Sequence, residues 1–153
     1  MHQAVTQRLA DAGLELPSAP GSVGDYVPAV LSGDLVFTSG QIPMVDGSLL
    51  SAGVVGDSVS VEDARYAAGV CALRALAAAA TAIDLDRVVR VVKVTGYVAS
   101  SADFTAQPTV IDGASAVMRA AFGEAGAHAR EAVGVAALPL GAPVEVSVVL
   151  EIA

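Results

Sequence analysis

The most informative stretch of the chain runs from residue 128 to residue 146 and reads HAREAVGVAALPLGAPVEV. Small and β-branched residues on both sides of a Pro- and Gly-containing turn predict two strands, which we place at 130–137 and 144–152. Two charges near the starts of these strands stand out, Arg130 in the first, where Glu131 follows it, and Glu145 in the second. Arginine is a planar donor suited to gripping a carboxylate, and charges are expensive to bury. We therefore expect each of these two charges either to form an ion pair or to take part in the function.

Strand-like runs also occur earlier in the chain. We expect strands at 27–31 and 35–38, joined by the turn Ser32-Gly33-Asp34. A longer run of β-branched residues at 88–98 predicts a strand covered on both faces. Residues 44–58 are expected to form an irregular loop.

Helical patterns lie between these runs. A short amphipathic helix is expected at 3–12, and the strongest helix at 60–83, with Ser60 as its N-cap. A further helix is expected within 103–122, with its regular part starting near Pro108. Hairpins mixed with crossover helices predict an α+β fold, in which helices pack on a mixed sheet.

The composition fits one domain that has more apolar surface than a single small core can hide. The chain has 153 residues, of which 54% are hydrophobic and only 4% aromatic, with a mean hydropathy of +0.64. We expect part of this apolar surface to lie in a subunit interface. The longest apolar-rich run between charges, residues 75–83, is too short to span a membrane, and residues 1–8 contain no hydrophobic signal core. A cytoplasmic location without membrane attachment is expected.

Charge and cysteine content narrow the classes of function further. Eight Lys and Arg stand against 16 Asp and Glu, a net charge of -8. This balance repels phosphate backbones, and the densest basic group, Arg87, Arg90 and Lys93, is small, so we expect no nucleic-acid partner. The single cysteine, Cys71, excludes an internal disulfide and is expected to be a buried thiol. No metal-ligand cluster is predicted.

Several motifs occur in order along the chain: Tyr26, the block VFTSGQIP at 36–43, Asp103-Phe104, Ala129-Arg130, and Leu138-Pro139 followed by Val144-Glu145-Val146. In these motifs and their spacing, with thirteen positions from Tyr26 to Ser39 and fifteen from Arg130 to Glu145, the chain resembles the reactive intermediate deaminase family. This family is also called YjgF-like or L-PSP endoribonuclease-like. The chain looks like a longer, divergent branch of it.

The resemblance implies a chorismate-mutase-like α+β fold, with two main helices on one face of a mixed sheet and a short N-terminal helix. Residues 1–153 would form one domain, with 1–25 as an N-terminal extension, and three copies would form a homotrimer with clefts between subunits. It also implies hydrolysis of enamine or imine intermediates, such as 2-aminoacrylate, to 2-keto acids and ammonia. No cofactor or metal is implied.

The resemblance also implies roles for individual residues. Arg130 would hold the carboxylate of the substrate, and Glu145 would position the attacking water. Tyr26 would line the cleft, and backbone groups near Gly40 and Ala132 would complete it.

The geometry of the two C-terminal strands tests this scheme. If they formed a hairpin, Arg130 would lie opposite about Glu151, and roughly 20 Å would separate Arg130 from Glu145 along the ladder. Two groups so far apart cannot serve one small substrate, so we predict that they meet from different subunits.

The chain departs from the family pattern beside the expected site. His128 replaces a Pro and is interpreted either as an incidental residue where the strand begins or as a residue at the rim of the cleft. Glu131 and Ala132 stand where Ser and Cys are common, and Pro108 stands where a site Asn is usual. The carboxylate of Glu131 could weaken an anion site at Arg130, although adjacent side chains of a strand point to opposite faces.

Two other functions compete with deamination. One is a trimer that binds small carboxylates without turnover, and the other is the ribonuclease or translation-inhibitor activity attached to some relatives, which the acidic charge disfavours. The residues have structural alternatives as well. Tyr26 can be an interface aromatic, Glu145 can be a buried partner of an Arg or of backbone donors, and Arg130 can be paired with Glu131, Glu145 or Glu151.

Overall fold

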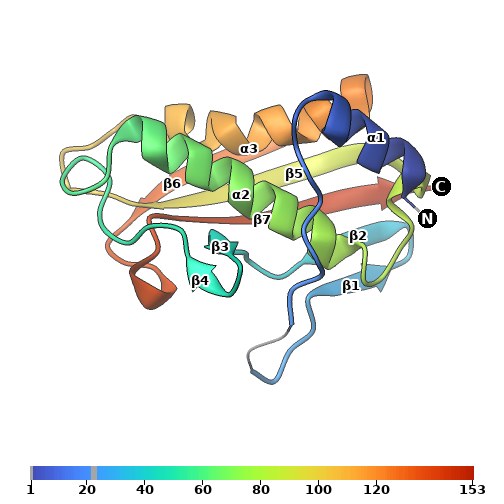
Figure 1. Ribbon diagram of the computed structural model, residues 1–153, viewed down its shortest axis with the longest axis horizontal. Helices are drawn as coiled ribbons and strands as arrows, with labels where there is room; N and C mark the ends of the chain where they lie inside the picture. Colours follow the sequence, from blue (N-terminus) through green and yellow to red (C-terminus); the bar gives the residue numbers. More distant parts are fainter. Residues whose placement is uncertain (1, 22–23) are drawn as a thin grey trace.

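An open five-stranded sheet forms the base of the molecule in the computed structural model, which describes residues 2–21 and 24–153 (Figure 1). β5 and β6 run parallel and every other neighbouring pair is antiparallel. The expected α+β fold with a mixed sheet is confirmed. In spatial order the strands are β1 (Ala29–Ser32), β2 (Leu35–Thr38), β7 (Val144–Ile152), β5 (Val88–Ala99) and β6 (Ala129–Val135).

Two long helices cover one face of this sheet, α2 (Val61–Ala79) and α3 (Gln107–Phe122) (Figure 1). The Ser60 hydroxyl accepts a hydrogen bond from the Asp63 N–H at 3.1 Å, so the predicted N-cap is confirmed. Pro108 lies in the first turn of α3, where its missing N–H leaves no bond unmade. α2 ends four residues earlier than expected.

The short N-terminal helix α1 (Gln3–Asp11) packs against α3 and buries Val5 and Leu9. The first turn of α1 has free backbone N–H groups, and two of them donate to the carboxylate of Asp86 in the 3-10 helix η1 (Leu85–Arg87). These hydrogen bonds come from Ala4 at 3.2 Å and from Val5 at 3.0 Å. None of the described helices combines the length and apolarity that crossing a bilayer requires.

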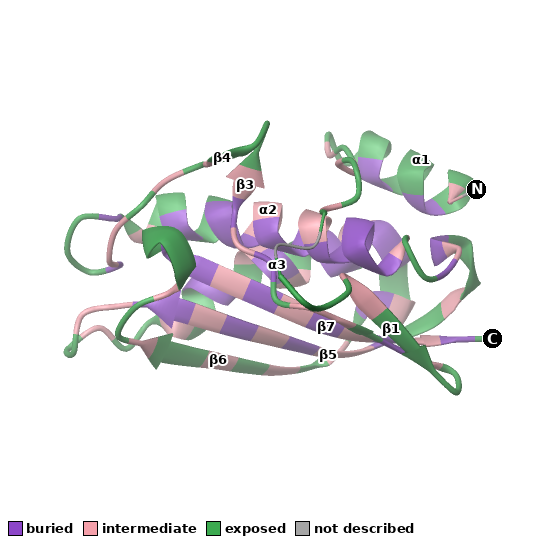
Figure 2. Ribbon diagram, turned by 90° about the horizontal axis from the view of Figure 1, so that it is seen from below, coloured by how far each residue is buried: buried purple, intermediate pink, exposed green. Residues whose placement is uncertain are grey.

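Burial alternates along the two central strands, as the bands of β5 and β7 in Figure 2 show. Val94 and Val98 of β5 are fully buried against the helices. The other face was expected to be covered too, but no element of the described chain lies on it. Val30, Phe37 and Val133 remain 44–50% exposed there.

The two C-terminal strands do not pair with each other, so the hairpin considered for them from the sequence is absent. β6 and β7 both pair with β5, on opposite sides of it, because α3 carries the chain to the far side of β5 before β6 begins. Residues 136–143 then cross the end of β5 and include the 3-10 helix η3 (Pro139–Gly141). The loop expected at 44–58 also contains a small hairpin, β3 (Met44–Val45) and β4 (Ser48–Leu49).

The contact between α2 and α3 generates a prediction about stability. A Cβ added at Gly113 would overlap the backbone carbonyl oxygen of Arg65, whereas one added at Gly69 would lie 3.5 Å from its nearest neighbour. Gly113→Ala should therefore destabilise the fold by roughly 1–3 kcal/mol through overpacking. Gly69→Ala should stabilise it by roughly 0.5–1 kcal/mol, because alanine restricts the unfolded chain. Urea unfolding at one protein concentration measures the free energy of unfolding of both variants. Equal changes in the two variants would contradict the close contact between α2 and α3 at Gly113.

Candidate functional site

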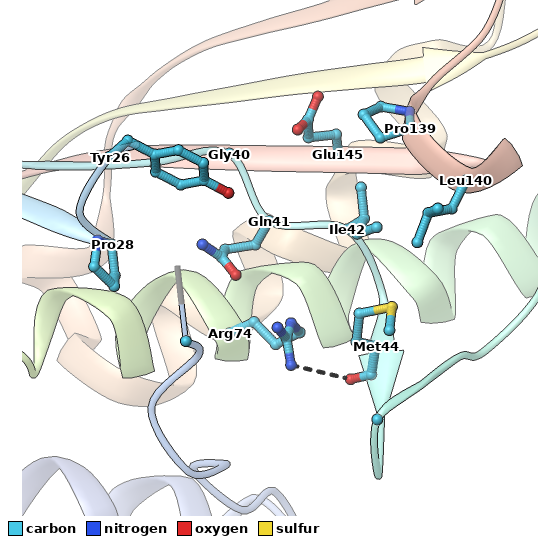
Figure 3. A pocket seen from close by; sticks show the side chains of 12 residues that line it. Tyr26, Pro28, Gly40, Gln41, Ile42, Met44, Arg74, Pro139, Leu140 and Glu145 are labelled. Carbon is cyan, nitrogen blue, oxygen red and sulfur yellow. Dashed lines mark hydrogen bonds between the residues drawn. The ribbon is translucent and has the colours of Figure 1, made fainter. Parts of the chain in front are cut away.

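A cavity of about 580 Å³ lies beside the start of β7, between α2, η3 and the connection from β2 to β3 (Figure 3). Its volume is in the range of small-molecule sites. Apolar side chains supply much of the wall and four polar side chains join them, Tyr26, Gln41, Arg74 and Glu145. The apolar contributors are Pro28, Ile42, Met44, Pro139 and Leu140.

Glu145 enters the cavity because of the alternation along β7. Its neighbours Val144 and Val146 are fully buried toward the helices, so its side chain points to the other face. Partial burial raises the pKa of the Glu145 carboxyl above its ordinary value. Among the described residues, no cation lies within ion-pair distance of this carboxylate.

Gly40 and Gln41 shape the wall next to Glu145. The Gln41 backbone pairs with Val146 through two hydrogen bonds of 2.9 and 3.0 Å, which fixes this connection against β7. A Cβ at Gly40 would lie 2.6 Å from Oε1 of Glu145, so any other residue would displace the carboxylate. The Ser39 hydroxyl donates to the Val27 carbonyl at 2.7 Å, which suits a role in shaping the turn. Tyr26 is half-exposed at the cavity wall.

Arg74 of α2 is the site residue that sequence reasoning missed. Its Nη1 donates to the Met44 carbonyl at 3.5 Å, and its buried Nε has no hydrogen-bond partner in the described part of the chain. Burial lowers the pKa of its guanidinium. A signal was present, because Arg74 is the only charged residue between Arg65 and Asp84.

Cys71 lies one turn before Arg74 and is fully buried, as predicted. Its Sγ is 3.6 Å from the Val144 carbonyl oxygen. Burial, with the negative charge of Glu145 as a smaller contribution, raises the pKa of the thiol well above its usual range. The thiol is therefore neutral and serves packing.

Arg130 lies elsewhere, on the helix-facing side of β6. Its Nη1 donates to Asp112 at 2.8 Å and to the Ser115 hydroxyl at 3.1 Å, and its Nη2 donates to the Pro108 carbonyl at 3.3 Å. Its partner is Asp112 rather than any of the three glutamates considered from the sequence.

Arg130 and Glu145 do not meet within one chain. They lie beside Val94 and Tyr97 of β5, on opposite faces and on opposite sides of that strand. Along β5 this is a separation of about 10 Å. The inference that they come together only from different subunits stays a prediction.

The remaining predicted residues surround Arg130. Glu131 points to the opposite face and forms an ion pair with Lys93 at 2.9 Å, so it does not occupy the Arg130 guanidinium. His128 bonds the Gly126 carbonyl at 2.6 Å and the Ser115 hydroxyl at 2.9 Å. Ala132 lies half-buried on the Arg130 side.

The structure thus brings Tyr26, Gly40 and Glu145 together and places Arg130, Ala132, His128 and Glu131 apart from them. In residues 2–21 and 24–153, no three His, Cys, Asp or Glu side chains are grouped as metal ligands.

Known proteins resemble the chain over nearly its whole length. Protein TCP17 of Trypanosoma cruzi is 43% identical over 150 residues, which cover 97% of this chain and 94% of that protein. The crystal structure of Atu1372 from Agrobacterium tumefaciens is 42% identical with a TM-score of 0.90, over 99% of this chain and 94% of that one. E. coli TdcF with bound serine is 27% identical with a TM-score of 0.63, over 88% and 94%. Residues 6–152 match the family described as "YjgF/chorismate mutase-like, putative endoribonuclease", and the chain belongs to this family.

Proposed function

We propose that the cavity hydrolyses reactive enamine or imine derivatives of small amino acids, of the 2-aminoacrylate kind, to 2-keto acids and ammonia. One observation carries the proposal: Glu145, a half-buried carboxylate without an ion-pair partner among the described residues, lines a largely apolar cavity. Such a carboxylate is free to bind a water molecule and to accept its proton.

The reaction balances with water as the only other reactant. An enamine takes a proton at its terminal carbon and becomes the imine. Water adds to the carbon of the C=N bond while Glu145 accepts the proton that the water loses. The tetrahedral intermediate then takes that proton on nitrogen, and the C–N bond breaks to release ammonia. The hydroxyl group loses its proton as the keto group forms, which replaces the proton that the enamine took up. Partial burial makes Glu145 a stronger base than an exposed glutamate, because it raises the pKa of the carboxyl.

The proposal includes a homotrimer in which Arg130 reaches the cavity of a neighbouring copy. The uncovered face of the sheet supports an interface, because Val30, Phe37 and Val133 are exposed apolar side chains on it. Arg130 uses three of its five N–H groups on α3, which leaves two donors for a ligand.

A second function, carboxylate binding without turnover, is favoured by one similar structure. E. coli TdcF holds bound serine, a small molecule with a carboxylate. In this alternative Glu145 would hold the amino group of a ligand and activate no water.

The ribonuclease activity of the family description is not part of the proposal. Each residue of the densest basic group already bonds to an acceptor within the chain. Arg87 donates to the Ala153 carbonyl, Arg90 pairs with Glu151, and Lys93 pairs with Glu131. With a net charge of -8, these residues form no free basic surface for a phosphate backbone.

Glu145→Gln tests the proposed chemistry. The wild-type protein should form pyruvate from freshly generated 2-aminoacrylate faster than the spontaneous reaction, and Glu145→Gln should return the rate to the spontaneous value. Glu151→Gln is the matched control on the same strand and face, and it should keep the activity. A wild-type rate equal to the spontaneous rate would refute hydrolysis and leave the binding alternative.

The pKa of Glu145 predicts two pH dependences. Activity should rise with pH through an apparent pKa above the ordinary 4.5 of a glutamate, since the ionised carboxylate is the base. Stability should change in the opposite direction. Between the unfolded pKa and the raised folded pKa, the folded state binds more protons, so the free energy of unfolding falls as pH rises. Glu145→Gln should remove this part of the fall in pH-dependent thermal melts.

Complementation between variants tests the shared cleft. Arg130→Ala and Glu145→Gln should each be inactive, and each should sediment as a trimer. Equal amounts unfolded and refolded together should recover about a quarter of the wild-type activity, because each mixed trimer contains one cleft with both native residues. The same variants mixed without unfolding are the control. No recovery after refolding would show that the two residues do not share a cleft.

A further inference from the structure

A chain of hydrogen bonds connects Arg130 to His128 through a serine of α3. Nη1 of Arg130 donates to the Ser115 hydroxyl at 3.1 Å, and the same hydroxyl lies 2.9 Å from Nε2 of His128. Nδ1 of His128 lies 2.6 Å from the Gly126 carbonyl oxygen. Ser115 therefore links the guanidinium to an imidazole that lies immediately before β6.

The two ends of this chain fix its direction. A carbonyl oxygen can only accept, so Nδ1 of His128 carries the proton that bonds Gly126. In the neutral ring Nε2 is then an acceptor, and the Ser115 hydroxyl donates to it. The oxygen of that hydroxyl keeps its lone pairs for the guanidinium, which can only donate. Each group thus bonds in the one sense that its chemistry allows.

The bonds to α3 also determine which edge of the guanidinium is free. Nη1 uses both of its N–H groups, on Asp112 and Ser115, and Nη2 uses one on the Pro108 carbonyl. These three residues are spaced by four and three positions, so they form one stripe of the helix and Nη1 faces it. In a planar guanidinium, Nε and Nη2 form the edge opposite Nη1. The Nε N–H and the second Nη2 N–H therefore lie parallel on the edge that faces away from α3.

His128 has a specific effect on Ser115 in this arrangement. A serine within a helix can donate its hydroxyl proton to the backbone carbonyl one turn earlier, which turns its oxygen toward the helix. The acceptor at Nε2 draws the proton of Ser115 away from that competing bond. The hydroxyl oxygen then stays in place as the second acceptor of Nη1, and two acceptors fix the plane of the guanidinium where Asp112 alone would allow it to turn.

We propose that Ser115 and His128 are positioning residues, which hold the free edge of Arg130 in the orientation that a substrate carboxylate requires. Two parallel N–H groups match the two oxygens of a carboxylate, so this edge favours a bidentate contact. The inference rests on the proposed function in taking Arg130 as the residue that meets the carboxylate. It concerns the orientation of Arg130 and does not depend on the role of Glu145.

Calorimetric titration with pyruvate, an inert carboxylate, tests the role of the two residues. Ser115→Ala should weaken binding by about fivefold, because one hydrogen bond that orients Arg130 is lost. Ser115→Thr keeps the hydroxyl and should restore most of the affinity. His128→Leu should weaken binding in the wild-type background and add nothing in the Ser115→Ala background, since it acts through the hydroxyl. Thr109→Ala is the matched control, an exposed hydroxyl of the same helix, and should bind as the wild type does.

Nuclear magnetic resonance gives readouts that a merely structural role would not move. At pH 8 the His128 ring, assigned by its loss in His128→Leu, should carry its proton on Nδ1. The Nη protons of Arg130 should be resolved at low temperature, because three hydrogen bonds oppose their rotation, and they should merge in Ser115→Ala. The ¹H–¹⁵N signal of Arg130 Nε, assigned by its loss in Arg130→Lys, should shift when pyruvate is added.

The outcomes separate this inference from the proposed function. A pyruvate-induced shift of the Nε signal without turnover of 2-aminoacrylate would refute hydrolysis and keep the positioning role. Turnover with kcat and KM unchanged in Ser115→Ala would keep hydrolysis and overturn the positioning role. A proton on Nε2 instead of Nδ1, an Nε signal that pyruvate does not move, or an equal effect of His128→Leu in both backgrounds would also overturn it. If Ser115→Ala fails to fold, the wild-type tautomer and the Nε signal decide.

Discussion

The alternation of side chains along β7 is the constraint on which the rest of the structure depends. This strand lies at the centre of the sheet, between β2 and β5. Its even-numbered residues, from Val144 to Ile152, fill the core beneath the helices and force the odd-numbered ones to the other face. Glu145 thus emerges where η3 and the Gly40 turn enclose a cavity. A slip of one residue would bury the carboxylate in the core, so the packing of the valines also fixes the chemistry.

Local patterns in the sequence were sufficient to predict most elements, and long-range pairing was not. The Ser60 cap and the position of Pro108 depend on neighbours within one helical turn, and both are found in the structure. The segment LPLGAP contains turn residues that suit a hairpin, but it connects strands on opposite sides of β5. Turn chemistry specifies how a chain bends. It does not specify which strand occupies the space between two segments.

The same distinction applies to the site. Tyr26, Gly40 and Glu145 could be found because they belong to motifs, and the structure places them around one cavity. Arg74 lies in an alanine-rich helix, where an isolated charge is ordinarily interpreted as solvated. Its depth depends on how closely α2 approaches the sheet, and the small buried residues of that helix, such as Ala67, Ala68 and Ala75, allow the close approach. This packing property has no signature at position 74 itself.

The electrostatics of the whole molecule give the two arginines different weights. A chain with a net charge of -8 repels small anions, although salt screens that field beyond about 8 Å. A carboxylate therefore gains attraction only from a cation close to where it binds. Arg130 already interacts with Asp112, so an anion there would meet a negative neighbour as well as the guanidinium. Arg74 has no such competitor within ion-pair distance among the described residues, and it lies where partial burial strengthens a charge interaction. An anion at Arg130 would therefore be positioned by the two N–H groups that α3 leaves unused, more than it would be attracted by net charge.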